Sequence, residues 1–368
     1  MRVLMSGGGT GGHVNPAIAI ANVIKKNEPD SEIAFVGTKR GIENKLVPHA
    51  GYELYHIEIQ GIRRSLSLDN IKTLYLAFKS FNDCKRIIKR FKPDVVIGTG
   101  GYACWPVVRA AASLGIKTIL HESNATPGFA VKMLEDKVDR IFVNFEETVK
   151  ELKYPEKAER VGNPLRGDFS SIDREIARKN QGITGKYEKF LLSCGGSMGA
   201  EQVNFAVLDM MREYTSKHPE ILHIHATGSI EYEISKKIFE DNGLDKCPNI
   251  VLQEYIYDMP EKMAACDLII NRAGAMTLSE IAMQHKASVL IPSPNVTNNH
   301  QYKNAHVLES AGAAVLIEEK NLNGHILSTV TEDILTNDAK RTEMENNSAK
   351  FALSGAGERI YEYIKNDK

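Results

Sequence analysis

Short apolar runs alternate with longer segments of helical periodicity along the first part of the chain. Val3-Leu4-Met5 has the pattern of a buried strand, and residues 16–24 then repeat apolar side chains at helical spacing. Further strand-like runs follow at residues 33–36, 95–97 and 118–120. β-rich runs that alternate with helices are typical of a parallel, doubly wound α/β sheet. The fold predicted for this region is therefore Rossmann-like.

The same pattern begins again after residue 188. A strand-like run precedes a second glycine loop at residues 195–199, and a shift of 187 places Ser6 on Ser193 and the first glycine loop on the second. A further correspondence, with a shift of 173, places residues 94–101 on residues 267–274. Two matches in the same order and with similar shifts indicate two domains of one architecture.

The predicted fold class is thus α/β, with two Rossmann-like doubly wound domains that face each other across a cleft. Residues 1–163 form the first domain and residues 164–345 the second, with a linker near residues 161–164. Residues 346–368 are expected to form a C-terminal helix that packs back on the first domain. Ligands of open α/β sheets bind beyond the carboxyl ends of the strands, so each domain would contribute loops to the cleft.

Composition narrows the class of protein. The 368 residues carry 46 Lys and Arg against 47 Asp and Glu, a formal net charge of −1 that gives no global attraction to nucleic acid. The five cysteines are scattered and include no C-x-x-C pair, which argues against a disulfide framework or a zinc site. No signal peptide precedes the first glycine loop, and no apolar run is long enough to span a bilayer. We expect a cytoplasmic protein that can still touch a membrane surface.

The first glycine loop satisfies G-x-G-x-x-G through Gly7, Gly9 and Gly12. It is a candidate phosphate site, and the basic residues 38–40 keep an NADP-dependent enzyme open, although that alternative leaves the second loop unexplained. A loop kept glycine-rich for tight packing is the simplest alternative. His13 follows at a helix start, where the dipole disfavours the imidazolium. The ring is either a general base or a hydrogen-bond donor to a phosphate, and the spacing does not decide between them.

The second glycine loop offers backbone N–H groups and the Ser197 hydroxyl to a diphosphate. Arg166, after the linker, is a phosphate partner or a surface arginine. Glu280 lies in the first turns of a helix, where it either accepts the hydroxyls of a ribose or only complements the dipole. The polar cluster at residues 298–301 suggests recognition of sugar hydroxyls.

A basic segment at residues 62–92 stands out from the near-neutral total. It carries nine Lys and Arg against two Asp, and it is also rich in Leu, Ile and Phe. Exposed apolar groups rimmed by cations suit an anionic membrane, at about 1 kcal/mol per basic residue. The alternative is a core-facing helix with a solvated basic side, and an RNA interface lacks any recognisable module. The candidate membrane contacts are Leu74, Phe78, Phe81, Lys72, Lys79, Lys85 and Arg86.

Six motifs together carry a resemblance that spans nearly the whole chain. They are GGTGGH at residues 8–13, GGY at 100–102, HESN at 121–124, GNPLR at 162–166, GGSMGA at 195–200 and GAMTLSE at 274–280. In this order they are similar to the peptidoglycan N-acetylglucosaminyltransferases of the MurG family, which have the GT-B fold. The resemblance implies an inverting transfer of GlcNAc from UDP-GlcNAc to the C4 hydroxyl of undecaprenyl-diphospho-MurNAc-pentapeptide.

The resemblance also implies roles for individual residues. His13 would be the catalytic base, Tyr102 would lie near the acceptor, Ile256 would hold the uracil by its backbone, and Glu280 would hold the ribose. The implied donor contacts are Thr10, Gly11, Gly12, Asn124, Arg166, Ser197, Ile256, Ala275, Met276, Thr277, Leu278, Ser279, Glu280 and Gln301.

No cofactor and no metal is implied. The implied partners are UDP-GlcNAc, the undecaprenyl-linked acceptor, an anionic membrane surface on the cytoplasmic side, and proteins of cell-wall synthesis and division. The alternatives are a UDP-GlcNAc 2-epimerase, another GT-B lipid glycosyltransferase, or a nucleotide-sugar sensor without turnover.

Overall fold

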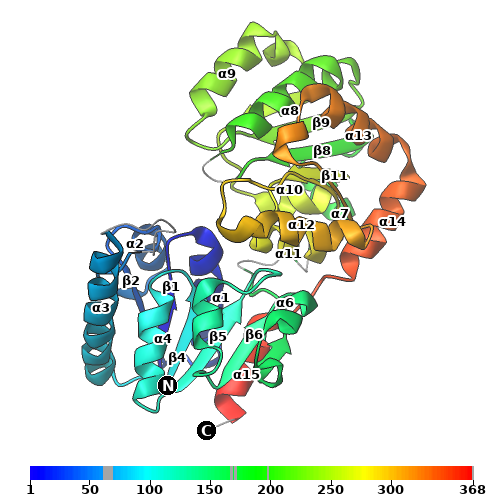
Figure 1. Cartoon of the computed structure of the whole chain (residues 1–368). Helices are drawn as coiled ribbons and strands as arrows, with labels where there is room; N and C mark the ends of the chain where they lie inside the picture. The colour runs from blue at the N-terminus through cyan, green and yellow to red at the C-terminus, as the bar shows by residue number, and fades with distance from the viewer. Residues whose placement is uncertain (61–68, 166–168, 170–171, 197–198, 367–368) are drawn as a thin grey trace. The chain divides into compact units, whose positions relative to one another are not determined.

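The computed structural model describes residues 1–60, 69–165, 169, 172–196 and 199–366, and of residues 69–75 only the backbone. The chain forms two compact units, residues 1–166 with 353–368, and residues 167–352. Each unit is built on one parallel β-sheet with helices packed on it (Figure 1).

The first unit has seven parallel strands in the order β3-β2-β1-β4-β5-β6-β7. The strands are β1 (Arg2–Gly7), β2 (Glu32–Thr38), β3 (Glu53–Ile57), β4 (Val95–Gly100), β5 (Lys117–Glu122), β6 (Arg140–Val143) and β7 (Ala158–Arg160). The helices are α1 (Gly11–Asn27), α2 (Glu43–His49), α3 (Asp69–Phe91), α4 (Cys104–Ser113), α5 (Phe129–Leu134), α6 (Glu146–Glu151) and α15 (Ala356–Asn366), with a 3₁₀ turn at Pro155–Lys157. The strand order reverses between β1 and β4, which is the point where Rossmann-like sheets bind ligands.

The second unit repeats this plan with six parallel strands in the order β10-β9-β8-β11-β12-β13. The strands are β8 (Lys189–Cys194), β9 (Ile221–Ala226), β10 (Ile250–Gln253), β11 (Leu268–Asn271), β12 (Ala287–Leu290) and β13 (Ala314–Leu316). The helices are α7 (Arg174–Asn180), α8 (Glu201–Glu213), α9 (Tyr232–Asp241), α10 (Met259–Ala265), α11 (Ala275–Met283), α12 (His300–Ser310), α13 (Gly324–Thr336) and α14 (Asp338–Ala349), with 3₁₀ turns at Thr215–Lys217, Leu244–Lys246, Thr297–Asn299 and Glu319–Asn321. Its order reverses between β8 and β11.

Burial on both faces explains the continuous apolar runs of the central strands. In β1, Val3 and Met5 belong to a core with Ile18 of α1, whereas Leu4 belongs to a core on the opposite face with Ile88 of α3. Successive side chains of a strand point to opposite faces, so a short apolar run serves two cores at once.

The last helix, α15, belongs to the first unit and packs against α1 (Figure 1). Gly357 lies so close to Val23 that a Cβ there would be 2.7 Å from the valine side chain. The Tyr361 hydroxyl donates to Glu28 at 3.3 Å, which ties the two helices together. The predicted boundary after residue 345 falls inside α14, and the second unit continues to Ala352.

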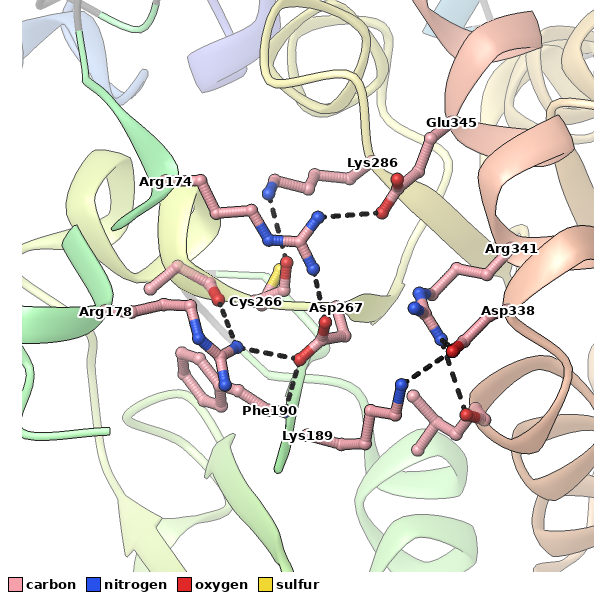
Figure 2. Close-up of polar contacts among 12 residues, drawn as sticks. Arg174, Arg178, Lys189, Phe190, Cys266, Asp267, Lys286, Asp338, Arg341 and Glu345 are labelled. Atoms are coloured by element: carbon pink, nitrogen blue, oxygen red, sulfur yellow. Dashed lines mark hydrogen bonds and ion pairs between the residues drawn. The ribbon is translucent and has the colours of Figure 1, made fainter. Parts of the chain in front are cut away.

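An aspartate at the start of a central strand fastens each sheet. Asp94 accepts a hydrogen bond from the backbone N–H of Arg2 at 2.7 Å, and Asp267 accepts one from the N–H of Phe190 at 2.7 Å. Asp94 is exposed, whereas Asp267 is buried between Arg174, with which it forms an ion pair, and Arg178 at 2.9 Å (Figure 2). The second unit therefore holds helix α7 to its sheet by a buried ion-pair cluster.

The predicted fold class is confirmed, since both sheets are wholly parallel and follow the Rossmann-like order. The shift of 187 places β1 on β8, and the shift of 173 places β4 on β11, so both correspondences fall at the switch points. The cleft between the domains stays a prediction. Within the described part of the chain, no helix has both the length and the apolar character needed to cross a membrane.

Candidate functional site

The first glycine loop lies at the carboxyl end of β1, against the loop that follows β4. The Gly8 N–H donates to the Gly100 carbonyl at 3.3 Å, and a Cβ on Gly101 would clash with the Gly8 carbonyl. Thr10 is the residue before α1, and Gly11 and Gly12 form its first turn. Tyr102 follows the β4 loop and is 60% exposed. The structure thus brings Thr10–Gly12 and Tyr102, the predicted donor and acceptor residues, to one edge of the first sheet.

His13 is held by the backbone of this same loop. Its Nδ1 atom lies 3.1 Å from the Gly8 carbonyl oxygen and 3.3 Å from the Thr10 hydroxyl. A carbonyl only accepts hydrogen bonds, so in the neutral ring we assign the proton to Nδ1 and the lone pair to Nε2. The ring also packs on Gly100, where a Cβ would lie 2.6 Å from its Cδ2 atom. In the neutral ring, this tautomer places the lone pair on Nε2, the atom that would accept a proton.

Asn124 lies in a loop after β5 that a buried carboxylate organises. Glu122 accepts hydrogen bonds from the Asn124 N–H and side-chain amide, both at 3.0 Å, and from the Gly128 N–H at 2.7 Å. The neighbouring His121 is fully buried and bonds the Gly162 carbonyl at 2.9 Å through Nε2. Burial lowers the pKa of His121 to about 4. The His121 side chain therefore lies in the interior of the first unit.

The second glycine loop follows β8 at the equivalent place in the second unit. The Gly199 N–H donates to the Gly196 carbonyl at 3.0 Å, and a side chain at Gly199 would clash with the Thr227 carbonyl. Ser197 and Arg166, two of the predicted donor contacts, lie outside the described residues. The α8 helix starts two residues beyond Gly199, so its N-terminus follows the loop directly.

A buried polar network, which the sequence analysis did not predict, lies beneath this loop. The Ser193 hydroxyl lies 2.9 Å from Nε2 of His223 and 2.9 Å from Nδ1 of His225. His225 in turn contacts the Asn204 side-chain oxygen of α8 at 3.1 Å. All four side chains are fully buried. Burial lowers the pKa of His225 to about 4 and holds that of His223 well below its ordinary value, so both rings are neutral.

The predicted ribose residue lies in α11, and the predicted uracil residue lies in the loop between β10 and α10. The segment Ala275–Glu280 forms the first two turns of α11, after β11. Leu278 is 1% exposed and Ile256 is 3% exposed, so their side chains pack inside and only their backbones can serve a ligand. Glu280 is half-buried beside the Cys194 thiol, and desolvation raises the pKa of its carboxyl to about 7.

The loop between β12 and α12 carries the predicted sugar-recognition cluster. Asn298 and Asn299 both adopt left-handed backbone conformations, with φ of 56° and 53°, which asparagine tolerates better than most residues. Gln301 accepts the Ser293 N–H at 2.9 Å, which fixes the start of α12. Met276, Thr277 and Ser279 of α11 are half-buried.

Helix α3 only partly matches the predicted membrane surface. Phe78 is 70% exposed. Phe81 instead packs against the core that contains Leu4 and Ile88, and the Lys85 ammonium lies 4.6 Å from the centre of its ring. Lys79 pairs with Glu58, and Arg86 pairs with Asp83. The membrane contact predicted for Phe81 stays a prediction, and its side chain is half-buried. The side chains of Lys72 and Leu74 lie outside the described residues.

Two Rossmann-like units, each with a glycine loop at its switch point, are the units from which the GT-B fold is built. The family models assign the chain to the glycosyltransferases. The model of the glycosyltransferase family 28 N-terminal domain matches residues 3–143, and that of the family 28 C-terminal domain matches residues 190–360.

A curated relative from Acetivibrio thermocellus, named UDP-N-acetylglucosamine–N-acetylmuramyl-(pentapeptide) pyrophosphoryl-undecaprenol N-acetylglucosamine transferase, is 44% identical over 99% of this chain and 98% of its own. The transferase of the same name from Lactococcus lactis subsp. cremoris is 40% identical over 99% of both chains. The chain belongs to this family of N-acetylglucosamine transferases.

Solved structures agree with this assignment. Acinetobacter baumannii MurG superposes with a TM-score of 0.78 at 26% identity, over 99% of both chains. A UDP-GlcNAc 2-epimerase from Neisseria meningitidis, solved with UDP-GlcNAc, superposes with a TM-score of 0.66 at 14% identity over the whole of both chains. The second likeness concerns the fold alone.

Proposed function

We propose that this protein transfers N-acetylglucosamine from UDP-GlcNAc to the C4 hydroxyl of undecaprenyl-diphospho-MurNAc-pentapeptide, which forms lipid II in peptidoglycan synthesis. The observation that carries the proposal is the 44% identity over 99% of the chain to a curated transferase of that name. The geometry of His13 and of the two glycine loops supplies the groups that such a transfer needs.

His13 acts as the general base in the proposed mechanism. Its Nε2 lone pair takes the proton from the acceptor hydroxyl, and the freed oxygen attacks the anomeric carbon of the donor. The bond from that carbon to the UDP oxygen breaks at the same time, the configuration inverts, and the electron pair leaves with UDP. The Nδ1–H bond to the Gly8 carbonyl at 3.1 Å supports this role, because it keeps the proton off Nε2.

The second unit holds the donor in this proposal. Backbone N–H groups of the second glycine loop and the α8 N-terminus would stabilise the charge that develops on the diphosphate, with help from Arg166. Glu280 would accept the ribose hydroxyls, and the Ile256 backbone would read the uracil edge.

One assay tests the function. The purified protein is incubated with labelled UDP-GlcNAc and the lipid-linked MurNAc acceptor, and the lipid fraction is examined for a labelled disaccharide. Release of UDP-ManNAc without an acceptor would instead indicate an epimerase, and donor binding without any product would indicate a sensor. Either result from folded protein would overturn the proposal.

The role of His13 has its own test. His13→Ala removes the base, so kcat is expected to fall about 10²- to 10⁴-fold. The dissociation constant of UDP-GlcNAc, measured by calorimetry, should change little because the proposed donor contacts remain. A kcat close to that of the unchanged protein would remove His13 from the mechanism.

We place the protein at the cytoplasmic face of the cell membrane, with α3 as the contact. Phe78 is an exposed apolar residue of this helix, and Arg86 and Lys89 are exposed about two and three turns further along. Binding to vesicles that contain phosphatidylglycerol should exceed binding to neutral vesicles and should fall with added salt. Phe78→Ser should weaken it further, whereas equal binding to both vesicle types would contradict the assignment.

A further inference from the structure

A buried carboxylate lies directly behind the first glycine loop. Glu43, the first residue of α2, is 0% exposed. Its Oε2 atom accepts the Gly9 N–H at 2.9 Å, and its Oε1 atom accepts the Thr38 N–H at 2.8 Å and the Thr38 hydroxyl at 2.9 Å. Three donors therefore converge on one carboxylate, with the glycine loop on one oxygen and the end of β2 on the other.

The surrounding backbone is shaped to admit this side chain. A Cβ on Gly8 would lie 2.8 Å from the Glu43 carboxylate, a Cβ on Gly37 would lie 2.6 Å from its Cγ, and a Cβ on Gly41 would clash with it. Burial by itself would raise the pKa of Glu43, but the hydrogen bonds from Gly9 and Thr38 outweigh it and lower that pKa. The carboxylate is thus charged, enclosed and fixed in position.

One peptide group connects this carboxylate to His13. The peptide between Gly8 and Gly9 donates its N–H to Glu43 at 2.9 Å and accepts Nδ1–H of His13 on its carbonyl at 3.1 Å. A trans peptide directs its N–H and C=O in opposite directions, so it can bridge two groups on either side. Hydrogen bonds in such a chain polarise one another, and an ionised acceptor makes the N–H bond the stronger kind.

We propose that Glu43 is a positioning residue for His13, and that it acts through the Gly8–Gly9 peptide to hold the imidazole in its Nδ1–H tautomer. The carboxylate fixes the plane of the peptide and increases the negative charge on the Gly8 oxygen. That oxygen in turn keeps the proton on Nδ1 and directs the Nε2 lone pair away from the loop. The catalytic consequence rests on the proposed role of His13 as base, whereas the tautomer itself does not.

The two carboxylate oxygens provide a matched pair of variants. In Glu43→Gln the amide nitrogen must replace one oxygen, so either Gly9 or Thr38 loses its acceptor, and the charge is lost in both cases. Thr38→Val removes only the hydroxyl that bonds Oε1, on the side away from the peptide. If Glu43 only stabilises the packing of this region, both variants should change the His13 tautomer and kcat to a similar extent. If Glu43 positions His13, only Glu43→Gln should change them.

The experiment reads the tautomer of His13 directly. Nitrogen-15 NMR of histidine-labelled enzyme at about pH 8, where histidine is neutral, distinguishes Nδ1–H from Nε2–H, and the His13→Ala spectrum assigns the signals. The unchanged enzyme and Thr38→Val should show the Nδ1–H form, and Glu43→Gln should show a mixture. The kcat of Glu43→Gln should fall about 10- to 100-fold, a size typical of losing a partner behind a reacting group, with KM for UDP-GlcNAc retained.

A folded Glu43→Gln variant that keeps the Nδ1–H form would overturn the proposal. If that variant does not fold, Glu43→Asp is measured in its place, because its shorter side chain cannot reach both segments, and an unchanged tautomer there has the same meaning. Normal turnover by His13→Ala would refute the base role but would leave the NMR result standing, so the two proposals fail separately.

Discussion

The two halves of this molecule share a strand order and a glycine loop, but different chemistry supports the two loops. In the first unit, the buried carboxylates of Glu43 and Glu122 accept backbone N–H groups of the site loops. In the second unit, the neutral side chains of Ser193, His225 and Asn204 lie beneath the loop. The first unit therefore holds a charged carboxylate against its loop, whereas the groups hydrogen-bonded beneath the second loop are neutral and the Glu280 carboxyl near that loop has a raised pKa.

This difference suggests a division of labour between the loops. A carboxylate that accepts the Gly9 N–H makes the first loop a poorer anion site. In the proposal above, this carboxylate instead holds the Nδ1–H tautomer of His13 through the Gly8–Gly9 peptide. The neutral network beneath the second loop adds no negative charge there, which suits a diphosphate. Gly7–Gly12 and Gly195–Gly199 look alike in sequence, and the residues behind them distinguish their proposed roles.

The largest expected difference between the two units is in how far acid pH lowers their stability. His223 and His225 in the second unit and His121 in the first have pKa values lowered by burial, so they stay neutral when folded. The unfolded chain binds their protons below about pH 6.5, so stability falls from there toward pH 4 by about 1.4 kcal/mol per pH unit for each histidine. Glu280, with its pKa raised to about 7, takes up a proton in the folded state and offsets one histidine between pH 7 and 4.5.

The stabilities of the two units are therefore best compared in a Glu280→Gln variant, because proton uptake by Glu280 no longer offsets the effect of one histidine. The second unit should then lose stability about twice as steeply as the first, near 2.8 against 1.4 kcal/mol per pH unit. Hydrogen exchange of β8–β9 and of β4–β5, measured between pH 7 and 5, follows each unit separately. Equal slopes for both units would show that His223 and His225 do not both stay neutral.

The strand-start aspartates give the next largest effect. Asp267→Asn breaks the ion pairs with Arg174 and Arg178. Arg174 keeps its pair with Glu345, but Arg178 loses its carboxylate partner in a largely buried position, so the variant should lose about 3 kcal/mol. The matched change Asp94→Asn affects an exposed side chain and should cost less than about 1 kcal/mol. Urea unfolding of both variants measures the contrast. Similar losses would mean that the cluster in Figure 2 does not stabilise the second unit more than its exposed counterpart stabilises the first.

The equivalent serines give a smaller effect. Ser193→Ala leaves two buried imidazoles without their shared hydroxyl and should cost about 1–3 kcal/mol. Ser6→Ala removes a single bond to the Val36 carbonyl at 3.1 Å and should cost about 1 kcal/mol or less. Thermal unfolding of the two variants should therefore show a larger loss for Ser193→Ala, and the reverse order would argue against a supporting role of the network.

The fold could be predicted from sequence because local signals mark it. The apolar run at residues 3–5 and the glycines that follow specify strand, turn and helix without reference to distant residues, and their repetition at residues 190–199 doubles the signal. The same glycines located both candidate loops, and the family motifs pointed to His13 directly after the first loop and to Glu280 in what the structure shows to be α11.

The groups behind the loops could not be predicted, because their contacts are distant in sequence. Glu43 lies 34 residues from Gly9 and follows an ordinary turn, and only the glycines at 37 and 41 hint that its side chain needs space. His223 and His225 alternate with apolar residues in β9, which indicates an inward face but not a partner. The basic residues of α3 are evident from the sequence, but their ion pairs are not. Lys79 pairs with Glu58 and Arg86 pairs with Asp83 only in the folded chain.

The carboxyl groups of Glu43 and Glu280 differ in pKa, and this difference leads to the last and smallest prediction. Glu43 has a lowered pKa and stays charged, whereas desolvation raises the pKa of Glu280 to about 7, so Glu280 is about half protonated at neutrality. A carboxylate accepts both ribose hydroxyls and a protonated carboxyl accepts them less well, so donor affinity should rise with pH up to about 7 and then level. Below that value KM for UDP-GlcNAc should rise at most tenfold per pH unit. Glu280→Gln should weaken binding and remove this dependence, and a pH-independent KM in the unchanged enzyme would show that Glu280 does not hold the donor as a carboxylate.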